Sequence, residues 1–366
     1  MSEIQKSLFR KKKVEEGEDE VGEDTVPPLG FTKPRRGPET EIKNWDEYFD
    51  ENFILETDNG RFNVYFTPPK DTKSPVFVFQ HGAGSSGLTF AVVSKKIRNK
   101  MQEDAEKAEK GTDKDGGQVG GILSFDMRGH GLTEAPGTDY LLETLTEDFF
   151  AVIEGVWKRN GWTDEANSPP VIMVGHSLGG SIVANAASKR RVKKLVGVVV
   201  MDVVEGPTLE SLHHMNKVLA SRPQWFDSVE RAIDWHIQTN TVRNRESACV
   251  SVPGVLKKDE ANSGYNWSID LTKTEPYWQG WFQGLSGRFL TAPAARLLIL
   301  AGTDRLDREL IAGQMQGKYQ LIVFQEAGHF LHEDEPYKAA LSLVEFWIRN
   351  GRPPKIVPAF GKFRNT

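Results

Sequence analysis

The sequence has a single cysteine, Cys249, and it has no apolar run of about 18 residues, the length that a membrane-spanning helix needs. One cysteine cannot form a disulfide within the chain, so a disulfide-stapled secreted fold is excluded. The opening residues, Met1 to Lys6, also lack the apolar core of a secretory signal. We therefore expect an intracellular, cytoplasmic protein in which Cys249 is packed rather than catalytic.

A strong net charge and the common ligand-binding motifs are missing as well. The formal charge of −5 gives no general attraction to nucleic acid or to membranes. There is no His-x-x-x-His or Cys-x-x-Cys pattern of a metal site, and the glycine-rich loop after residues 76–79 lacks the Walker lysine of a phosphate-binding loop. We expect no metal, no cofactor, no nucleic acid and no membrane among the ligands of this chain.

The first 44 residues have too few apolar side chains to order themselves. The basic cluster Arg10–Lys13 precedes the acidic run Glu15–Asp24, and four prolines follow. Such short charged runs are usually solvated, so we predict a disordered charged tail over residues 1–44. A nuclear-import role of the basic cluster, and with it a nuclear as well as a cytoplasmic location, is the alternative.

From Trp45 onward, apolar strand patterns alternate with helical ones. After a predicted hairpin over 53–66, the predicted strands are uniformly apolar and cover 76–79, 122–125, 171–174, 195–201, 296–301 and 319–324. Uniformly apolar strands that alternate with helices are typical of a mostly parallel sheet covered on both faces. We therefore predict an α/β fold with helices on both sides of a central sheet.

Two segments interrupt this alternation. Residues 99–118 are charged and then Gly-rich, and we find nothing apolar to anchor them, so we predict a charged surface insertion. Residues 205–290 are rich in Trp and Arg and mainly helical in pattern, which predicts an inserted lid. Its aromatic stripe over 277–289 is expected to be mostly core, with some rings free to line a substrate groove. The core is then formed by residues 45–204 and 291–366, the latter including a C-terminal tail.

The most informative stretch is a predicted strand, Val171–Val174, followed by Gly175-His176-Ser177-Leu178-Gly179 and a helix that opens on small residues. A Gly-x-Ser-x-Gly turn between a strand and a helix is the context of a nucleophile elbow. Side chains at 175 and 179 would collide with their neighbours, and amides at the helix start can stabilise a negatively charged oxygen. We predict that Ser177 is a catalytic nucleophile.

A serine nucleophile needs a base, and a histidine held by a carboxylate is the usual one. His329 follows the last predicted strand on a Gly-His turn, where its ring can reach the serine. His332 is the rival, but it precedes Glu333, Asp334 and Glu335, so we expect it on the surface.

The acid is ambiguous from position alone. Asp202 ends the strand after the nucleophile unit, and Asp304 ends the next one, where the acid most often lies. Asp307 is a weaker third candidate. The position slightly favours Asp304.

Two further turns are expected around the serine. His81-Gly82-Ala83-Gly84 has the His-Gly-x-Gly form, so the amides of Ala83 and Leu178 are predicted to form the oxyanion hole. The segment Asp126-Met-Arg128-Gly-His130-Gly131 is expected to hold loops together through carboxylate–backbone and arginine contacts rather than to catalyse.

These residues resemble a known family. The elbow is shared by many α/β-hydrolases, and the more specific segments are Met201-Asp-Val-Val-Glu-Gly206, Lys273-Thr-Glu-Pro-Tyr-Trp-Gln-Gly-Trp-Phe282, Ala301-Gly-Thr-Asp-Arg-Leu-Asp307, Gly313-Gln-Met-Gln-Gly-Lys318 and Gly328-His329 to Asp334. Together, over roughly residues 45–350, they resemble the protein phosphatase methylesterases. The resemblance covers neither the N-terminal tail nor the 99–118 insertion.

The resemblance implies an α/β-hydrolase fold and a serine carboxylesterase. It implies a substrate too: the methyl ester on the C-terminal leucine of the catalytic subunit of type 2A protein phosphatase. Against our positional preference, it assigns the acid to Asp202, with Ser177 and His329. Ala83 stands where the family often has glycine, which leaves the amide available. The alternatives are a generic small-ester or thioester hydrolase and a mainly non-catalytic, inhibitory phosphatase-binding factor.

Overall fold

The computed structural model describes residues 41–111, 117–261, 263–302 and 305–351. The strands are β1 (Glu51–Thr57), β2 (Gly60–Thr67), β3 (Val76–Gln80), β4 (Gly121–Phe125), β5 (Val171–His176), β6 (Leu195–Met201), β7 (Leu256–Asp259), β8 (Gly264–Trp267), β9 (Ala295–Ala301) and β10 (Gln320–Phe324). The α-helices are α2 (Ala91–Glu109), α3 (Leu142–Arg159), α4 (Leu178–Ser188), α5 (Glu205–Ala220), α6 (Val229–Gln238), α7 (Arg245–Ser251), α8 (Trp278–Phe282), α9 (Leu285–Thr291), α10 (Arg308–Met315), α11 (Leu331–Asp334) and α12 (Pro336–Asn350). Four 3₁₀ turns are η1 (Trp45–Glu47), η2 (Gly87–Phe90), η3 (Val252–Val255) and η4 (Leu271–Tyr277).

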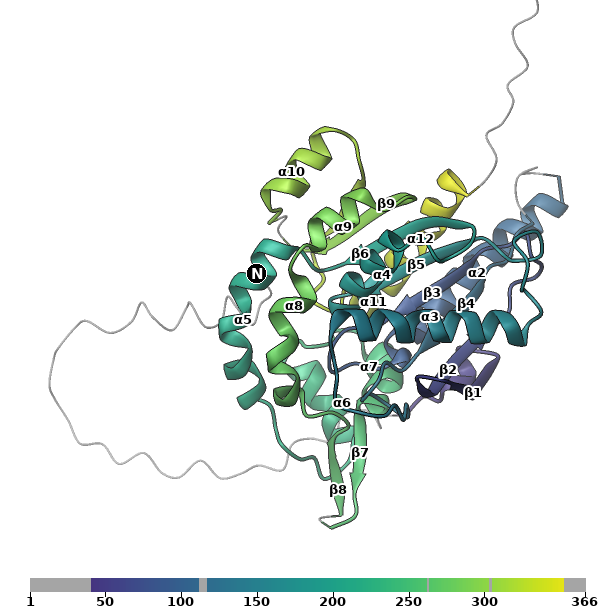
Figure 1. The fold of residues 1–366 in the computed structure, drawn as a ribbon. Helices are drawn as coiled ribbons and strands as arrows, with labels where there is room; N and C mark the ends of the chain where they lie inside the picture. The colour runs from purple at the N-terminus through teal and green to yellow at the C-terminus, as the bar shows by residue number, and fades with distance from the viewer. Residues whose placement is uncertain (1–40, 112–116, 262, 303–304, 352–366) are drawn as a thin grey trace, which may run out of the picture.

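Eight strands form one central sheet in the order β1-β2-β4-β3-β5-β6-β9-β10. The pairs β1–β2 and β2–β4 are antiparallel, and the other neighbouring strands are parallel. Figure 1 shows α2 and α12 on one side of this sheet and α3 and α4 on the other. The predicted mostly parallel sheet with helices on both faces is confirmed.

The central strands are largely apolar because both of their faces are buried. Along β3, Val76 and Val78 belong to the core cluster that contains α3 and α4. Phe77 and Phe79 belong to the opposite cluster, which contains α2 and α12. Successive strand residues point to opposite faces of a sheet, so two covered faces require apolar residues at every position.

The segment 205–290, which we predict to be a lid, contains helices α5 to α9 and the antiparallel hairpin β7–β8. The hairpin is not evident in the sequence, because β7 reads Leu-Lys-Lys-Asp and has a mostly exposed face. Part of the segment has its own small core around Phe226, Ile233 and the buried Cys249, which is packed as expected. The aromatic residues Trp278, Trp281 and Phe282 are buried in the main core.

One expectation about the 99–118 insertion is wrong. Helix α2 continues to Glu109, and the side chains of Met101 and Ala105 are buried. Ile97, Met101 and Ala105 follow each other at intervals of four residues, so they share the helix face that packs on the protein. These buried apolar side chains anchor the first half of the segment to the protein. Residues 112–116 lie outside the described part of the chain.

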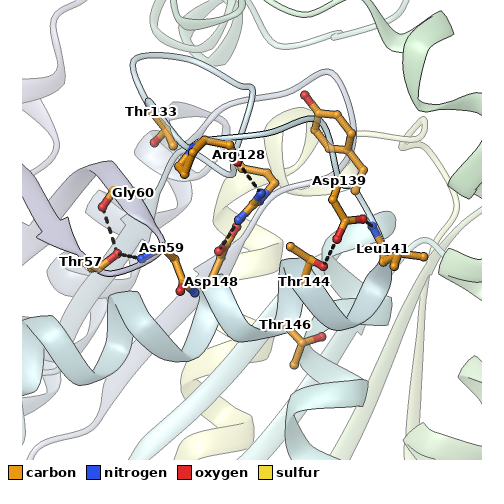
Figure 2. Close-up of polar contacts among 12 residues, drawn as sticks. Thr57, Asn59, Gly60, Arg128, Thr133, Asp139, Leu141, Thr144, Thr146 and Asp148 are labelled. Atoms are coloured by element: carbon orange, nitrogen blue, oxygen red, sulfur yellow. Dashed lines mark hydrogen bonds and ion pairs between the residues drawn. The ribbon is translucent and has the colours of Figure 1, made fainter.

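The turn over residues 126–131 holds loops together, as predicted. The Asp126 carboxylate accepts hydrogen bonds from the amides of Gly87, at 2.7 Å, and Leu132, at 3.0 Å. The Arg128 guanidinium makes a forked, buried contact with Asp148 of α3, at 2.5 and 2.8 Å (Figure 2). Figure 2 also shows Asp139 bound to Thr144 at the start of the same helix.

None of the helices that the structure describes is long and apolar enough to cross a membrane.

The Asp148–Arg128 contact predicts a large effect of a small substitution. In Asp148→Asn, Arg128 stays buried without a counter-ion, so the free energy of unfolding should fall by about 3 kcal/mol. Glu147→Gln, at the preceding residue of the same helix, breaks an exposed pair with Arg191 and should cost less than about 1 kcal/mol. Urea denaturation of the two variants measures this difference. Equal losses would contradict a structural role of the buried pair.

Candidate active site

Ser177 lies at a sharp turn between β5 and α4. Its backbone has φ 54° and ψ −122°, a conformation that costs a non-glycine residue about 1–3 kcal/mol. The turn is held by two backbone hydrogen bonds: the Ser177 amide donates to Met201 O at 2.9 Å, and the Gly180 amide donates to Ser177 O at 2.8 Å. The serine is thus fixed on a strained backbone at the carboxyl end of a central strand.

The two glycines around this turn are required by close backbone contacts. A Cβ atom on Gly175 would lie 2.1 Å from Gly179 O, and a Cβ on Gly179 would lie 2.0 Å from Gln80 O. Both distances are far below van der Waals contact, and both obstacles are backbone atoms that cannot rotate away. The steric reason for the Gly-x-Ser-x-Gly pattern is therefore present in the structure.

The glycine-rich loop after β3 lies against the serine. A Cβ on Gly82 would come within 2.9 Å of Ser177 Cβ. Ala83 follows Gly82 directly, and Leu178 follows Ser177, so both residues predicted for the oxyanion hole border the nucleophile. Their role stays a prediction.

Two buried histidines fix this loop. The Gly84 amide donates to His130 Nε2 at 2.9 Å, and the Met127 amide donates to His81 Nε2 at 2.9 Å. A ring nitrogen that accepts a hydrogen bond carries no proton, so both rings are neutral. Burial agrees with this, since it lowers the pKa of His130 to about 4 and that of His81 to about 3. The motif 126–131 therefore reaches the predicted oxyanion loop directly, through His130.

His329 and Asp202 meet beside the elbow. The His329 Nδ1 donates to Asp202 Oδ2 at 2.8 Å, and the other carboxylate oxygen of Asp202 accepts from the Ala301 amide at 2.8 Å. These two donors orient the carboxylate. With the proton on Nδ1, Nε2 is left free to act as a base.

The other two candidate acids are placed differently. Asp307 caps α10: its carboxylate accepts from the Leu310 amide at 2.9 Å and from the Ser286 hydroxyl at 2.6 Å. Asp304 lies outside the described residues. Of the candidates that the structure describes, Asp202 alone contacts His329.

The Ser177 hydroxyl makes no hydrogen bond to any described residue, His329 included. Catalytic hydrogen bonds are often long before a substrate is bound. The His329 side chain is 42% exposed, so its ring has room to turn.

His176 ties the elbow to the base-bearing loop, and its role is not evident from the sequence. Its Nε2 lies 2.8 Å from the carbonyl oxygen of His329 and its ring centroid 4.6 Å from that of His329. A carbonyl only accepts, so Nε2 carries the proton and donates it. Burial lowers the pKa of His176 well below its usual value, which keeps the ring neutral. Its position between Gly175 and Ser177 is the one signal that could have drawn attention to it.

The expectation that His332 lies on the surface is wrong. Its side chain is fully buried, stacks on Phe90 at 4.7 Å between ring centroids, and lies 4.6 Å from the His176 ring. Its Nε2 is 2.8 Å from the hydroxyl of Thr89, and burial lowers its pKa to about 3. The acidic residues beside His332 made a surface position look favourable, but α11 points its acidic side chains inward. The Asp334 carboxylate, for example, accepts a hydrogen bond from the Gly328 amide at 2.7 Å.

Glu333 completes a buried polar network behind His329. Its carboxyl group contacts the hydroxyls of Ser251, at 2.6 Å, and Thr89, and no cation pairs with it among the described residues. Burial raises its pKa to about 8. Ser251 ends α7 of the predicted lid, and Thr89 lies in η2 after the glycine-rich loop. The network therefore joins the loop that carries His329 to both segments.

The described residues contain no group of three or more His, Cys, Asp or Glu side chains arranged to hold a metal ion. The chemistry available at this site is that of a hydroxyl, an imidazole and a carboxylate, with backbone amides beside them. Such a set transfers an acyl group from an ester to water.

Comparisons with known proteins give close relatives and a shared fold. A model of the alpha/beta hydrolase family matches residues 76–341. Protein phosphatase methylesterase 1 of Yarrowia lipolytica is 49% identical over 322 residues, which cover 87% of this chain and 76% of that protein. Protein phosphatase methylesterase 1 of Schizosaccharomyces pombe is 43% identical over 326 residues, which cover 87% of this chain and 89% of that protein.

Two solved structures share the architecture. The crystal structure of E-2-(acetamidomethylene)succinate hydrolase aligns with a TM-score of 0.60 at 17% identity, and the alignment covers 81% of this chain and 98% of that one. The thioesterase domain from the curacin biosynthetic pathway aligns with a TM-score of 0.57 at 19% identity, covering 81% and 99%. At these identities the likeness is one of fold alone.

The hydrogen bond from His176 to His329 predicts a positioning role. In His176→Leu the donor is lost, and the labelling of Ser177 by a fluorophosphonate should slow about tenfold, which corresponds to one lost buried hydrogen bond. His176→Gln has an amide N–H of similar reach and should restore most of the rate. Equal rates for His176→Leu and the unchanged protein, at equal thermal stability, would rule out this role.

The buried Glu333 predicts a pH-dependent stability. Its folded pKa of about 8 lies above the usual 4.5, so the folded protein keeps a proton that the unfolded chain releases. The stability that this group contributes is present at low pH and is lost as the pH rises from about 5 to 8. Relative to Glu333→Gln, the unchanged protein should lose about 1 kcal/mol of unfolding free energy per pH unit in this window.

Chemical denaturation at several pH values between 5 and 8 measures the Glu333 effect. Glu345→Gln, an exposed position on α12, is the control and should run parallel to the unchanged protein. If the curve of Glu333→Gln is also parallel to it, the carboxyl group is not buried in its neutral form.

Proposed function

Since this chain belongs to the protein phosphatase methylesterase family and has the α/β-hydrolase fold that its motifs predict, we propose that it removes the methyl ester from the C-terminal leucine of the catalytic subunit of type 2A protein phosphatase. The observation that carries this is the 49% identity to a protein phosphatase methylesterase over 87% of the chain. The contact between His329 and Asp202, beside a strained serine, supports the same chemistry.

The proposed reaction begins at Ser177. His329, oriented by Asp202, takes the proton of the hydroxyl as its oxygen attacks the ester carbonyl. The amides of Ala83 and Leu178 stabilise the oxyanion of the tetrahedral intermediate, and each such donor is typically worth about 3 kcal/mol. The intermediate expels methanol, which is protonated by His329.

A water molecule then completes the proposed reaction. His329 takes one of its protons as the water attacks the acyl-enzyme, and the product leaves as a leucine carboxylate. The ester is neutral and the product is charged, so apolar contacts at this end favour release of the product, whereas a contact with a cation would retain it. Because the substrate is the tail of a protein, the lid must leave an open path to Ser177.

The partner also has a proposed part in alignment. The Ser177 hydroxyl has no hydrogen-bond partner among the described residues, and His329 is partly exposed. We expect the bound phosphatase to bring the serine and the imidazole together, so that it speeds fluorophosphonate labelling of Ser177.

Two other functions predict different experimental results. A generic small-ester or thioester hydrolase would prefer small acyl esters to a methylated protein tail. A non-catalytic phosphatase-binding factor would inhibit its partner equally well without the serine. The names of the relatives favour the methylesterase. Substitution of Ser177 separates it from the binding factor, and a comparison of small acyl esters with the methylated tail separates it from the generic hydrolase.

The decisive measurement is mass spectrometry of the phosphatase C-terminal peptide after incubation with purified protein. The unchanged protein should release the methyl group, and Ser177→Ala should be slower by at least about a thousandfold, because the nucleophile is absent. Binding to the phosphatase should remain. Demethylation by Ser177→Ala at the normal rate would refute the proposed mechanism, and no demethylation by the unchanged protein would refute the proposed substrate.

The same assay decides between the two acids. Asp202→Asn should lower kcat by at least about a thousandfold, since the imidazole loses the carboxylate that orients it. Asp304→Asn is the matched control, as the rival acid at the end of the next strand, and should stay within about threefold of the unchanged protein. The reverse result would transfer the role of the acid to Asp304.

A further inference from the structure

Arg222 is an arginine of the predicted lid that lies two residues beyond the end of α5. Its guanidinium carbon is 5.4 Å from the centroid of the Trp267 ring, within the range of a cation–π contact. Trp267 in turn donates from its indole nitrogen to the carbonyl oxygen of Pro223 at 2.7 Å. The ring and the adjacent backbone thus fix the position of the arginine side chain.

The guanidinium lies beside the glycine-rich loop that follows β3. A Cβ on Gly84 would be 3.8 Å from Nη1 of Arg222 and 2.8 Å from Cδ1 of Leu271. Gly84 is two residues from Gly82, the glycine that packs on Ser177. A charged and an apolar side chain of the predicted lid therefore meet at the same point of this loop, close to the nucleophile.

Arg222 has no anionic partner among the described residues. Its guanidinium makes no hydrogen bond and no ion pair there, and burial lowers its pKa without any carboxylate to oppose the shift. The neighbouring His236 is neutral, since burial lowers its pKa to about 4. Arg128, by contrast, is buried against Asp148.

A partly buried guanidinium without a counter-ion is unfavourable, because it loses hydration and gains nothing in return. Such a group is stabilised when a ligand brings a negative charge. A planar guanidinium suits a carboxylate in particular, since two parallel N–H donors match its two oxygens.

We propose that Arg222 binds a carboxylate of the substrate tail or of the product, at a subsite beside the glycine-rich loop. The proposal rests on the proposed function, in which a peptide enters next to Ser177. The carboxylate has two possible sources. It is either an acidic side chain just upstream of the leucine ester, or the terminal carboxylate that the reaction creates. In both cases Arg222 determines specificity and takes no part in bond breaking.

Synthetic peptides that end in leucine methyl ester test the first source. An aspartate is placed in turn at each of the four positions before the leucine, and each peptide has an asparagine counterpart. At one position the unchanged protein should favour aspartate over asparagine about tenfold in kcat/KM, mainly through KM. This ratio should fall to about one in Arg222→Gln and stay partly in Arg222→Lys, which keeps the charge without the fork.

The second source is tested with the same peptides as free acids and as C-terminal amides. If Arg222 holds the terminal carboxylate, the free acid should inhibit the unchanged protein about tenfold more strongly than the amide, and Arg222→Gln should abolish that difference. Arg231→Gln is the matched control, because Arg231 is an exposed arginine of the same segment in α6 with only a weak surface pair to Asp227. It should behave as the unchanged protein in both arms.

Protection of Ser177 from fluorophosphonate labelling gives a readout that does not depend on turnover. If peptides protect the unchanged protein but are not hydrolysed, the proposed function fails while the Arg222 subsite is still measured. If Arg222→Gln, folded as judged by its melting temperature, shows the same preferences as the unchanged protein for every pair of peptides, the subsite is refuted and the proposed function is unaffected.

Discussion

The backbone of Ser177 is held at a positive φ angle in a turn so tight that neither Gly175 nor Gly179, two residues to either side, can be replaced by a residue with a side chain. Gly179 lies against the backbone of Gln80, the last residue of β3, so the glycine-rich loop must begin beside the serine. The amide of Ser177 is bound to the end of β6, and Asp202 is the next residue of that segment. One strained turn therefore sets the positions of the oxyanion loop and of the acid.

Neutral histidines hold the surrounding loops. His81 and His130 accept hydrogen bonds from backbone amides, while His176 donates one to a backbone carbonyl. A neutral imidazole can do either without placing a charge in the protein interior, where an unpaired charge is costly. Burial lowers the pKa of each of the three. None of these three rings therefore adds a charge near His329, whose Nδ1 contacts the Asp202 carboxylate.

The sequence predicts features that depend on local pattern, and it fails where packing decides. The apolar strands, the elbow at Ser177 and the Gly-His turn at His329 follow from short-range spacing. The inward orientation of His332 and Glu333 does not follow from spacing, because charged residues are usually exposed. These two are buried because α11 packs against η2 and α7. Likewise, position at a strand end could not separate Asp202 from Asp304, since parallel neighbouring strands end at the same edge of the sheet.

The core and the predicted lid contribute to the site in different ways, and the difference has a physical basis. The central sheet holds its catalytic candidates on strand ends and tight turns, which are rigid because both faces of the sheet are packed. Leu271 and Arg222 of segment 205–290 instead reach the glycine-rich loop with their side chains, and in the described part of the chain no backbone hydrogen bond joins this segment to residues 175–179. Substitutions of Leu271 and Arg222 can therefore alter which acyl group is accepted while the strained serine and its base stay in place.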